Sequence, residues 1–158
     1  MLSGHAQIYY AMITIQSFTK DILPDIETSN RLSGFLHTHL EQFGDQKEAI
    51  QKAIDYALAK NDQSGGLILT AEDENKEMVG AVVINRTGMK DYIPENILVY
   101  IATHKERRGK GIGKQLMQKA IAQCEGSIAL HCEPHNPARK LYESLGFTSK
   151  YLEMRLNK

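Results

Sequence analysis

One stretch of this chain constrains its fold more than any other, because it joins an apolar strand to an amphipathic helix through glycines and cations. The stretch is Arg107-Arg108-Gly109-Lys110-Gly111-Ile112-Gly113-Lys114, here called the glycine loop. The apolar run from Ile97 to Thr103 precedes it and predicts a strand. After it, apolar residues at helical spacing predict one buried helix face: Ile112, Leu116, Met117, Ala120, Ile121 and Cys124. The sequence therefore predicts a strand, a tight turn and a helix in direct succession.

The glycine loop has the chemistry of a phosphate-binding site. The first turn of a helix carries N–H groups without an intrahelical partner, and the aligned peptide dipoles add positive charge there. Anions bind readily at such an end. Its three glycines allow a sharp turn and a close approach to a phosphate, while Arg107, Arg108, Lys110 and Lys114 add positive charge. We therefore expect the loop to hold a phosphorylated ligand.

Two common phosphate motifs do not fit these residues. The P-loop pattern requires glycine at position 108 and serine or threonine at 115, where Arg108 and Gln115 stand. The dinucleotide-binding fingerprint requires a glycine at position 114, which is Lys114. Neither ATP nor NAD is therefore favoured. The pattern Arg/Gln-x-x-Gly-x-Gly does fit, through Arg108, Gly111 and Gly113.

Together with a second motif, this pattern resembles the GCN5-related N-acetyltransferase (GNAT) superfamily. The second motif is Asn136-Pro137-Ala138-Arg139-Lys140-Leu141-Tyr142-Glu143-Ser144-Leu145-Gly146-Phe147, and the close resemblance covers Ile97 to Phe147. It implies an N-acetyltransferase that uses acetyl-CoA as cosubstrate and transfers the acetyl group directly to a primary amine of a small molecule or polypeptide. A module that binds CoA or acyl-CoA without catalysis is the alternative.

The resemblance also implies which residues bind the cosubstrate. Backbone groups of three strand residues are expected at the acetyl and pantetheine portion: Ile101, Ala102 and Thr103. The loop residues are expected at the pyrophosphate: Arg108, Gly109, Lys110, Gly111, Ile112, Gly113 and Lys114. The family's CoA-contacting asparagine corresponds to His135, with Asn136 one position later, so both are candidates. Asn136 before Pro137 is also a good helix N-cap.

The resemblance places Tyr142 where many family members have a tyrosine that hydrogen-bonds the departing CoA sulfur. A phenol, with a pKa of about 10, is a weaker acid than a thiol at about 8.5, so we expect hydrogen bonding rather than simple proton donation. Alternatively, Tyr142 is only part of a buried helix face. Some family members have a glutamate where this chain has Leu130, so the general base is open. Glu133, Glu72, Glu95 and solvent are the candidates.

The order of predicted elements is βααβββαβαβ, which indicates an α/β fold with a mixed, largely antiparallel central sheet and helices on both faces. That order is also the order of the GNAT fold, in which the strand before the glycine loop and the next strand splay apart. We expect one domain over residues 1–158. The expected segments are strand Ile8 to Thr19, a helix capped by Ser29 or Asn30, a helix around Ala49 to Leu58, strands Leu67 to Glu72, Met78 to Asn85, Ile97 to Thr103 and Ile128 to Cys132, helix Pro137 to Leu145, and a final strand with Leu152, Met154 and Leu156.

Composition narrows the class of partner. Nineteen basic and nineteen acidic residues cancel, which argues against binding to nucleic acid or to an anionic membrane. Two cysteines do not make a disulfide framework, and we expect a cytoplasmic protein with no membrane anchor. No established zinc pattern fits the histidines, so no metal is expected. We expect His37, His39 and Glu41 in a helical wall near the acceptor, or facing water. Related proteins often pair, so a homodimer is a further possibility.

Overall fold

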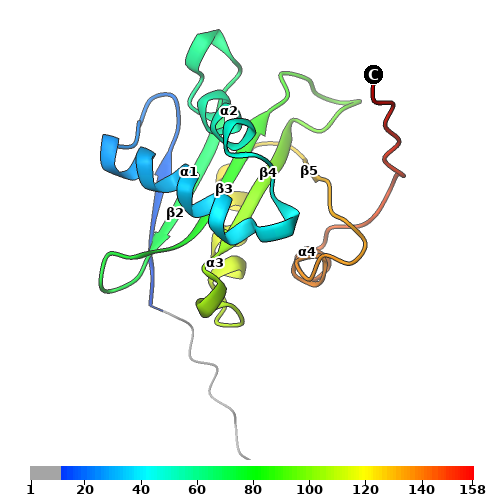
Figure 1. Ribbon diagram of the computed structural model, residues 1–158. Coiled ribbons are helices and arrows are strands. Elements are labelled where there is room, and N and C mark those ends of the chain that lie inside the picture. The colour runs from blue at the N-terminus through cyan, green and yellow to red at the C-terminus, as the bar shows by residue number, and fades with distance from the viewer. Residues whose placement is uncertain (1–11) are drawn as a thin grey trace, which may run out of the picture.

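A five-stranded sheet organises the protein, and four helices cover its two faces (Figure 1). The structure is a computed structural model and describes residues 12–158. The helices and strands are β1 Thr14–Phe18, α1 Ile26–Leu40, α2 Lys47–Ala57, β2 Gly66–Glu72, β3 Met78–Arg86, β4 Asn96–Thr103, α3 Ile112–Gln123, β5 Ile128–Leu130 and α4 Arg139–Ser144.

The sheet is mixed, as the sequence predicts. Its strand order is β1-β2-β3-β4-β5; the first four strands pair antiparallel in succession, and β5 pairs parallel to β4. Parallel neighbours need a crossover connection, and α3 provides it between β4 and β5. The expected hairpin is β2 and β3, joined by the charged turn from Asp73 to Glu77.

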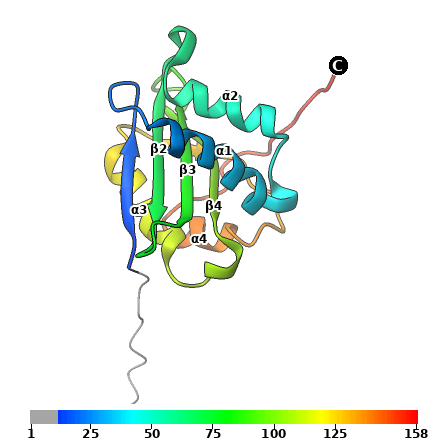
Figure 2. The same ribbon diagram turned by 60° about the vertical axis from the view of Figure 1, so that its left-hand side comes forward.

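Helices lie on both faces of the sheet, which confirms the predicted layers. In Figures 1 and 2, α1 and α2 cover one face, while α3 and α4 lie on the other. Two apolar clusters result. Ala81 and Val83 of β3 join the cluster under α1 and α2, whereas Val82 and Ile84 join the cluster under α3 and α4. A strand buried on both sides explains why β3 is apolar along most of its length.

β4 and β5 separate along their length, as the resemblance implies. They pair only from Asn96 to Leu98, so residues 99 to 103 of β4 have no partner on β5. The register with β3 also shifts, since Val83 faces Tyr100 and Ile84 faces Leu98. Val99 is thus an extra residue in β4, that is, a β-bulge. After the bulge, β4 still pairs with β3, but its other edge has no partner on β5 up to the end of the strand before the glycine loop.

Two predicted segment boundaries in the first part of the chain differ from the structure. The first strand begins at Thr14; the predicted residues 8 to 11 lie outside the described part of the chain. Helix α1 begins at Ile26 rather than after Ser29 or Asn30. Its N-cap is Asp25, whose Oδ1 accepts a hydrogen bond of 2.7 Å from the Thr28 N–H. Asp25 caps the helix earlier because it satisfies one of the free N–H groups of the first turn.

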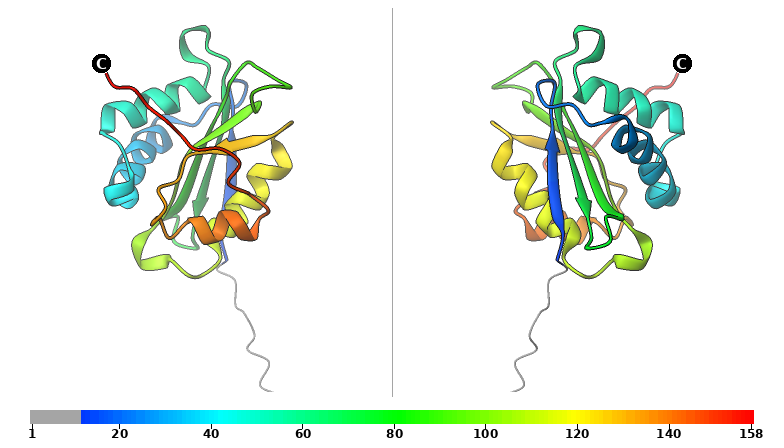
Figure 3. Two further views of the ribbon diagram at one scale, coloured as in Figure 1. Left: turned by 90° about the vertical axis from the view of Figure 1, so that its right-hand side faces the viewer. Right: turned by 90° about the vertical axis from the view of Figure 1, so that its left-hand side faces the viewer.

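The final predicted strand is wrong. Residues after Gly146 contain no helix or strand, and they form an extended chain outside the sheet (Figure 3). Leu152, Met154 and Leu156 are 90%, 89% and 83% exposed. An alternating apolar pattern forms a strand only where a neighbouring strand pairs with it, and β5 has β4 as its only partner among residues 12–158. The observed order therefore ends at α4, as βααβββαβα.

Candidate functional site

The glycine loop turns between β4 and α3 with the backbone angles that glycine allows. Gly109 has φ of 75° and Gly111 has φ of 80°, both in the left-handed region. Gly111 is the N-cap of α3, so the helix begins at Ile112 without a side-chain cap. A Cβ added at Gly109 would meet no heavy atom within 4 Å beyond its two chain neighbours, so the space beside this backbone is open.

The backbone N–H groups from Gly109 to Lys114 donate no hydrogen bond to any residue of the described chain, 12–158. The first internal bond of this helix end is from the Gln115 N–H to the Gly111 carbonyl, at 3.0 Å. A run of free N–H groups at a helix N-terminus, with the positive end of the helix dipole, favours an anion. The loop therefore fits the phosphate ligand that the sequence predicts.

The cations of the glycine loop divide into two kinds. The Arg107 guanidinium contacts the Asp73 carboxylate at 2.9 Å. The Arg108 guanidinium donates to the His39 carbonyl at 2.9 Å and lies 3.5 Å from the Glu41 carboxylate. Both arginine side chains thus tie the loop to the protein. Lys110 and Lys114 are exposed and make no ion pair among residues 12–158, so they are the cations available to a ligand.

Ile101, Ala102 and Thr103 lie in the part of β4 that has no partner on β5. Gly113 brings α3 close to this strand and to α4: a Cβ there would lie 3.6 Å from Thr103 Oγ1 and 3.3 Å from Leu141 Cδ2. The structure therefore brings the strand end and the start of α3, which both carry predicted cosubstrate residues, close to α4, which carries Tyr142.

Tyr142 lies on α4 and is 8% exposed. It belongs to the apolar cluster on the α3 side of the sheet, and its ring is 6.0 Å from the ring of Phe147. Burial, with a smaller effect from Cys132, raises the pKa of Tyr142 to about 12. Its hydroxyl has no hydrogen-bond partner within the described residues, so it can donate to a ligand.

The turn before α4 carries the other candidates. Asn136 Oδ1 accepts a hydrogen bond of 2.9 Å from the Ala138 N–H, and the Asn136 carbonyl accepts one of 3.0 Å from Arg139. The expected N-cap is therefore wrong: α4 begins at Arg139 rather than at Pro137, and its N-cap is Ala138, without a side-chain cap. The Asn136 side chain instead stabilises the turn that precedes the helix. His135 and Glu133 are exposed on the same turn, and the Glu133 carboxylate makes no ion pair in the described part of the chain.

The other two candidate bases are occupied. Glu72 lies 3.4 Å from the Arg31 guanidinium. Glu95 Oε2 accepts a hydrogen bond of 2.7 Å from the Ser127 N–H, and this bond, with other backbone donors, lowers the pKa of Glu95. Glu95 also precedes β4, at the end of the strand away from the glycine loop. Of the three glutamates, Glu133 is the one whose carboxylate is not engaged.

Two contacts near the site were not predicted from the sequence. Tyr100 on β4 donates a 2.5 Å hydrogen bond to Asp45, on the connection between α1 and α2. Burial and the Asp45 carboxylate raise the pKa of Tyr100. His39 is 8% exposed, not facing water, and its Nδ1 accepts a hydrogen bond of 3.2 Å from the Lys105 N–H. No pattern along the chain pairs residues 55 or 66 positions apart, so neither contact had a sequence signal.

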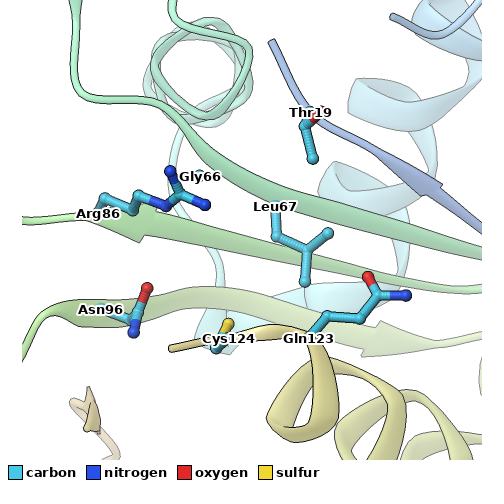
Figure 4. Close-up of a pocket in the computed structure, with 7 residues that line it drawn as sticks. All are labelled: Thr19, Gly66, Leu67, Arg86, Asn96, Gln123 and Cys124. Atoms are coloured by element: carbon cyan, nitrogen blue, oxygen red, sulfur yellow. The ribbon is translucent and has the colours of Figure 1, made fainter. Parts of the chain in front are cut away.

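Two recesses in the surface lie away from the separation of β4 and β5. One, of about 200 Å³, is shown in Figure 4; its lining residues are Thr19, Gly66, Leu67, Arg86, Asn96, Gln123 and Cys124. These residues lie where α3 ends and β4 begins, opposite to the glycine loop. The other, of about 310 Å³, lies between the β2–β3 turn and the start of α3, and includes Arg107 and Lys110. Tyr142 lines neither recess.

Comparison with known proteins gives a family and a fold. The sequence profile of the acetyltransferase (GNAT) domain matches residues 64–149. Solved structures with the same fold include aminoglycoside N-acetyltransferase AAC(6')-Iy in complex with CoA, at 16% identity, covering 94% of this chain and 95% of that chain, with a TM-score of 0.66. A ribosomal-protein-alanine N-acetyltransferase from Brucella melitensis biovar Abortus 2308 has 18% identity, covers 93% of this chain and 100% of its own, and has a TM-score of 0.62. No curated protein sequence matches the chain.

Proposed function

Because this chain belongs to the acetyltransferase (GNAT) domain family, we propose that it is an N-acetyltransferase that transfers an acetyl group directly from acetyl-CoA to a primary amine. The amine belongs to a small molecule or a polypeptide. The observation that carries the proposal is the run of free backbone N–H groups from Gly109 to Lys114 at the start of α3. Free N–H groups at a helix start bind phosphate groups well. A solved acetyltransferase with the same fold is a complex with CoA, so we take the CoA pyrophosphate as the anion that binds here.

In this proposal, each part of the site has one task. The loop residues 108 to 114 bind the pyrophosphate through backbone N–H groups, with Lys110 and Lys114 adding charge. Ile101, Ala102 and Thr103 pair with β3 but not with β5, so the edge of β4 that faces away from β3 offers backbone groups to the pantetheine and acetyl groups. The turn before α4 adds a contact from His135 or Asn136; the Asn136 Oδ1 is engaged with the Ala138 N–H, which leaves its side-chain NH2 group as a donor, so both residues stay candidates.

The reaction forms a C–N bond and breaks the C–S bond of the thioester. The amine attacks the acetyl carbon, and β4 backbone N–H groups stabilise the oxyanion that develops. The sulfur leaves with a negative charge, and the Tyr142 hydroxyl donates a hydrogen bond to it. The attacking nitrogen loses a second proton as the amide forms, and this proton converts the thiolate to the CoA thiol. An amine with a pKa of about 10.4 must first lose a proton, which costs about 4.6 kcal/mol at pH 7. We propose that Glu133 accepts this proton, either directly or through a water molecule, because the Glu133 carboxylate makes no ion pair among residues 12–158.

A non-catalytic module that binds CoA is the second candidate. It is favoured by Glu72 and Glu95, which are both engaged in structural contacts and leave one exposed glutamate as base. This candidate predicts tight binding of CoA, no turnover with any amine, and the same CoA affinity in wild type and Tyr142→Phe.

Turnover distinguishes the two candidates. The purified full chain is incubated with acetyl-CoA and a panel of amines that includes aminoglycosides, polyamines, amino acids and peptides with free N-termini, and release of the CoA thiol is followed. We expect thiol release with at least one amine, reduced in Gly109→Asp and retained in the matched neutral variant Gly109→Asn. Binding of acetyl-CoA without thiol release across the panel would favour the module and contradict the enzyme.

We also propose a cytoplasmic location, supported by two cysteines, Cys124 and Cys132, that are both free. Within residues 12–158, no helix is long and apolar enough to cross a membrane. In the same part of the chain, no group of three histidine, cysteine, aspartate or glutamate side chains could hold a metal ion. Pairing of two copies stays a prediction.

A further inference from the structure

The last turn of α1 contacts the segment that leads into the glycine loop. His39 Nδ1 accepts a hydrogen bond of 3.2 Å from the Lys105 N–H, and the His39 carbonyl accepts one of 2.9 Å from the Arg108 guanidinium. The imidazole lies between two rings, with centroids 4.6 Å from Phe35 and 4.2 Å from His104. One buried residue therefore contacts both ends of the turn from Lys105 to Arg108, which leads into the glycine loop.

We propose that His39 is a positioning residue for the cosubstrate: its neutral imidazole holds the glycine loop in the form that binds the CoA phosphates, and its protonation releases the loop. The inference rests on the proposed function, since it assigns the loop to CoA. His39 itself touches no reacting atom; its imidazole acts through the Lys105 N–H, while the bond from Arg108 goes to the His39 main-chain carbonyl and is the same in every side-chain variant.

The hydrogen bond fixes the protonation state that positions the loop. A nitrogen that accepts a hydrogen bond carries no proton, so His39 is neutral, with its proton on Nε2. Protonation would put a hydrogen on Nδ1, facing the Lys105 N–H, and two donors would then oppose each other. The Lys105 N–H would lose its acceptor, and the turn from Lys105 to Arg107 would lose its contact with α1.

The charges around His39 also oppose its protonation. Burial is the largest effect that lowers the pKa of His39. His104, Arg108 and Lys105, on the segment packed against α1, lower it further, and Glu41 is the group that raises it. The imidazole is therefore neutral at pH 7 and gains its proton only as the pH falls below the ordinary histidine range, near 6.5.

Glu41 also contacts the glycine loop, through Arg108, and it does so from a strained backbone conformation. It ends α1 with φ of 54° and ψ of −130°, a backbone conformation that residues other than glycine rarely adopt. There its carboxylate lies 3.5 Å from Arg108, while Arg108 also satisfies a carbonyl of the last helical turn. A cation at a helix C-terminus is favourable, so the strained end of α1 and the start of the loop stabilise each other.

The test compares three variants by calorimetric titration with CoA at pH 5.5, 6.5, 7.5 and 8.5. His39→Ala removes the acceptor. His39→Asn keeps one, because the asparagine Oδ1 stands where the imidazole Nδ1 stands, but it does not titrate. His37→Ala is the matched control, since His37 is exposed on the same helix. Thermal melting by circular dichroism checks that every variant is folded.

We expect His39→Ala to bind CoA about fivefold or more weakly than wild type at pH 7.5, and His37→Ala to bind like wild type. Between pH 7.5 and 5.5 wild type should lose several-fold more affinity than His39→Asn. This comparison cancels the titration of the CoA phosphates, which affects both proteins equally. Equal affinities of His39→Ala and His37→Ala, or parallel pH curves of wild type and His39→Asn, would overturn the inference.

Failure of the proposed function has a different signature. If wild type binds no CoA at any pH, the assignment of the loop fails, and hydrogen exchange of the Lys105 amide decides whether His39 positions the loop. Protection of this amide in wild type and His37→Ala, lost in His39→Ala, would retain the positioning role. Equal exchange in all three proteins would overturn it.

Discussion

Replacing Tyr142 by phenylalanine removes one hydroxyl and leaves the packing of α4 intact. The ring lies in the apolar cluster beside Phe147, and the hydroxyl has no hydrogen-bond partner among residues 12–158. Its removal therefore leaves no donor or acceptor of the protein unsatisfied, and we expect little change in melting temperature. An effect on turnover can then be assigned to the hydroxyl itself.

The size of that effect follows from the acidity of the phenol. With a pKa of about 12 for Tyr142, transfer of its proton to a thiolate, whose conjugate acid has a pKa of about 8.5, is uphill by about 5 kcal/mol. Tyr142 thus stabilises the leaving sulfur as a hydrogen-bond donor. A hydrogen bond to a charged group contributes about 1.5 to 3 kcal/mol, so Tyr142→Phe should lower kcat by about 10- to 150-fold.

The assay is steady-state thiol release with an accepted amine, measured from pH 6 to 10 for wild type and Tyr142→Phe. Because the sulfur gains charge only as the bond breaks, kcat should fall while KM for acetyl-CoA changes little. Tyr142 stays protonated over this range, so any loss of activity at high pH should be the same in both proteins. Equal kcat values, or a high-pH loss below pH 10 that Tyr142→Phe abolishes, would refute this reasoning.

Three other predictions test the fold and the site. Thr70 is 1% exposed and its hydroxyl has no partner among the described residues, so Thr70→Val should raise the unfolding free energy by about 1 to 3 kcal/mol in denaturant titration; a decrease would mean that the hydroxyl is bonded. Deletion of residues 151–158 should shift the melting temperature by less than about 4 °C, the equivalent of about 1 kcal/mol, because the apolar side chains of this segment are exposed; a larger drop would mean that the segment packs in solution. Burial raises the pKa of both thiols, Cys124 and Cys132, and Cys132 lies near Tyr142, so bound CoA should slow alkylation of Cys132 by iodoacetamide at pH 8 and leave Cys124 unchanged; protection of Cys124 alone would place the ligand elsewhere.

Most of the fold could be predicted because local patterns and pairing agree. Helix α3 repeats apolar residues at helical spacing and follows the glycine loop directly, and β2 and β3 flank a charged turn. For the hairpin, the segment that follows along the chain is also the strand that pairs, since β2 pairs with β3. The start of α1 was less clear because Asp25, Ser29 and Asn30 are all good caps, and the choice depends on which of them satisfies a free N–H group.

The final strand shows where local patterns are insufficient. Leu152, Met154 and Leu156 alternate as in a half-buried strand, yet a strand requires a neighbour at the right distance and register. β5 is three residues long and pairs with β4 alone in the described chain. The alternation of apolar residues does not show whether another strand is free to pair with this segment. For that reason it could not predict correctly whether a strand forms.

The candidate site divides in the same way. The backbone of the glycine loop could be predicted, because Gly109 and Gly111 adopt the left-handed conformations for which glycine is needed. The role of Arg108 could not, since its guanidinium contacts His39 and Glu41, residues far away along the chain. Its guanidinium ties the loop to α1, and its contribution to binding a ligand stays a prediction. Side-chain direction depends on tertiary contacts that residue type does not specify.

Calorimetric titration of acetyl-CoA into wild type, Gly109→Asn and Gly109→Asp tests the central claim most directly. A Cβ at Gly109 would meet no heavy atom within 4 Å beyond its two chain neighbours, and asparagine and aspartate are nearly equal in size and both tolerate the left-handed backbone, so the two variants differ chiefly in charge beside the free N–H groups. We predict that wild type and Gly109→Asn bind acetyl-CoA, whereas Gly109→Asp binds at least about tenfold more weakly, because its carboxylate repels the phosphates. Equal affinity of the two variants, or no binding by folded wild type, would contradict the assignment of this loop to the cosubstrate.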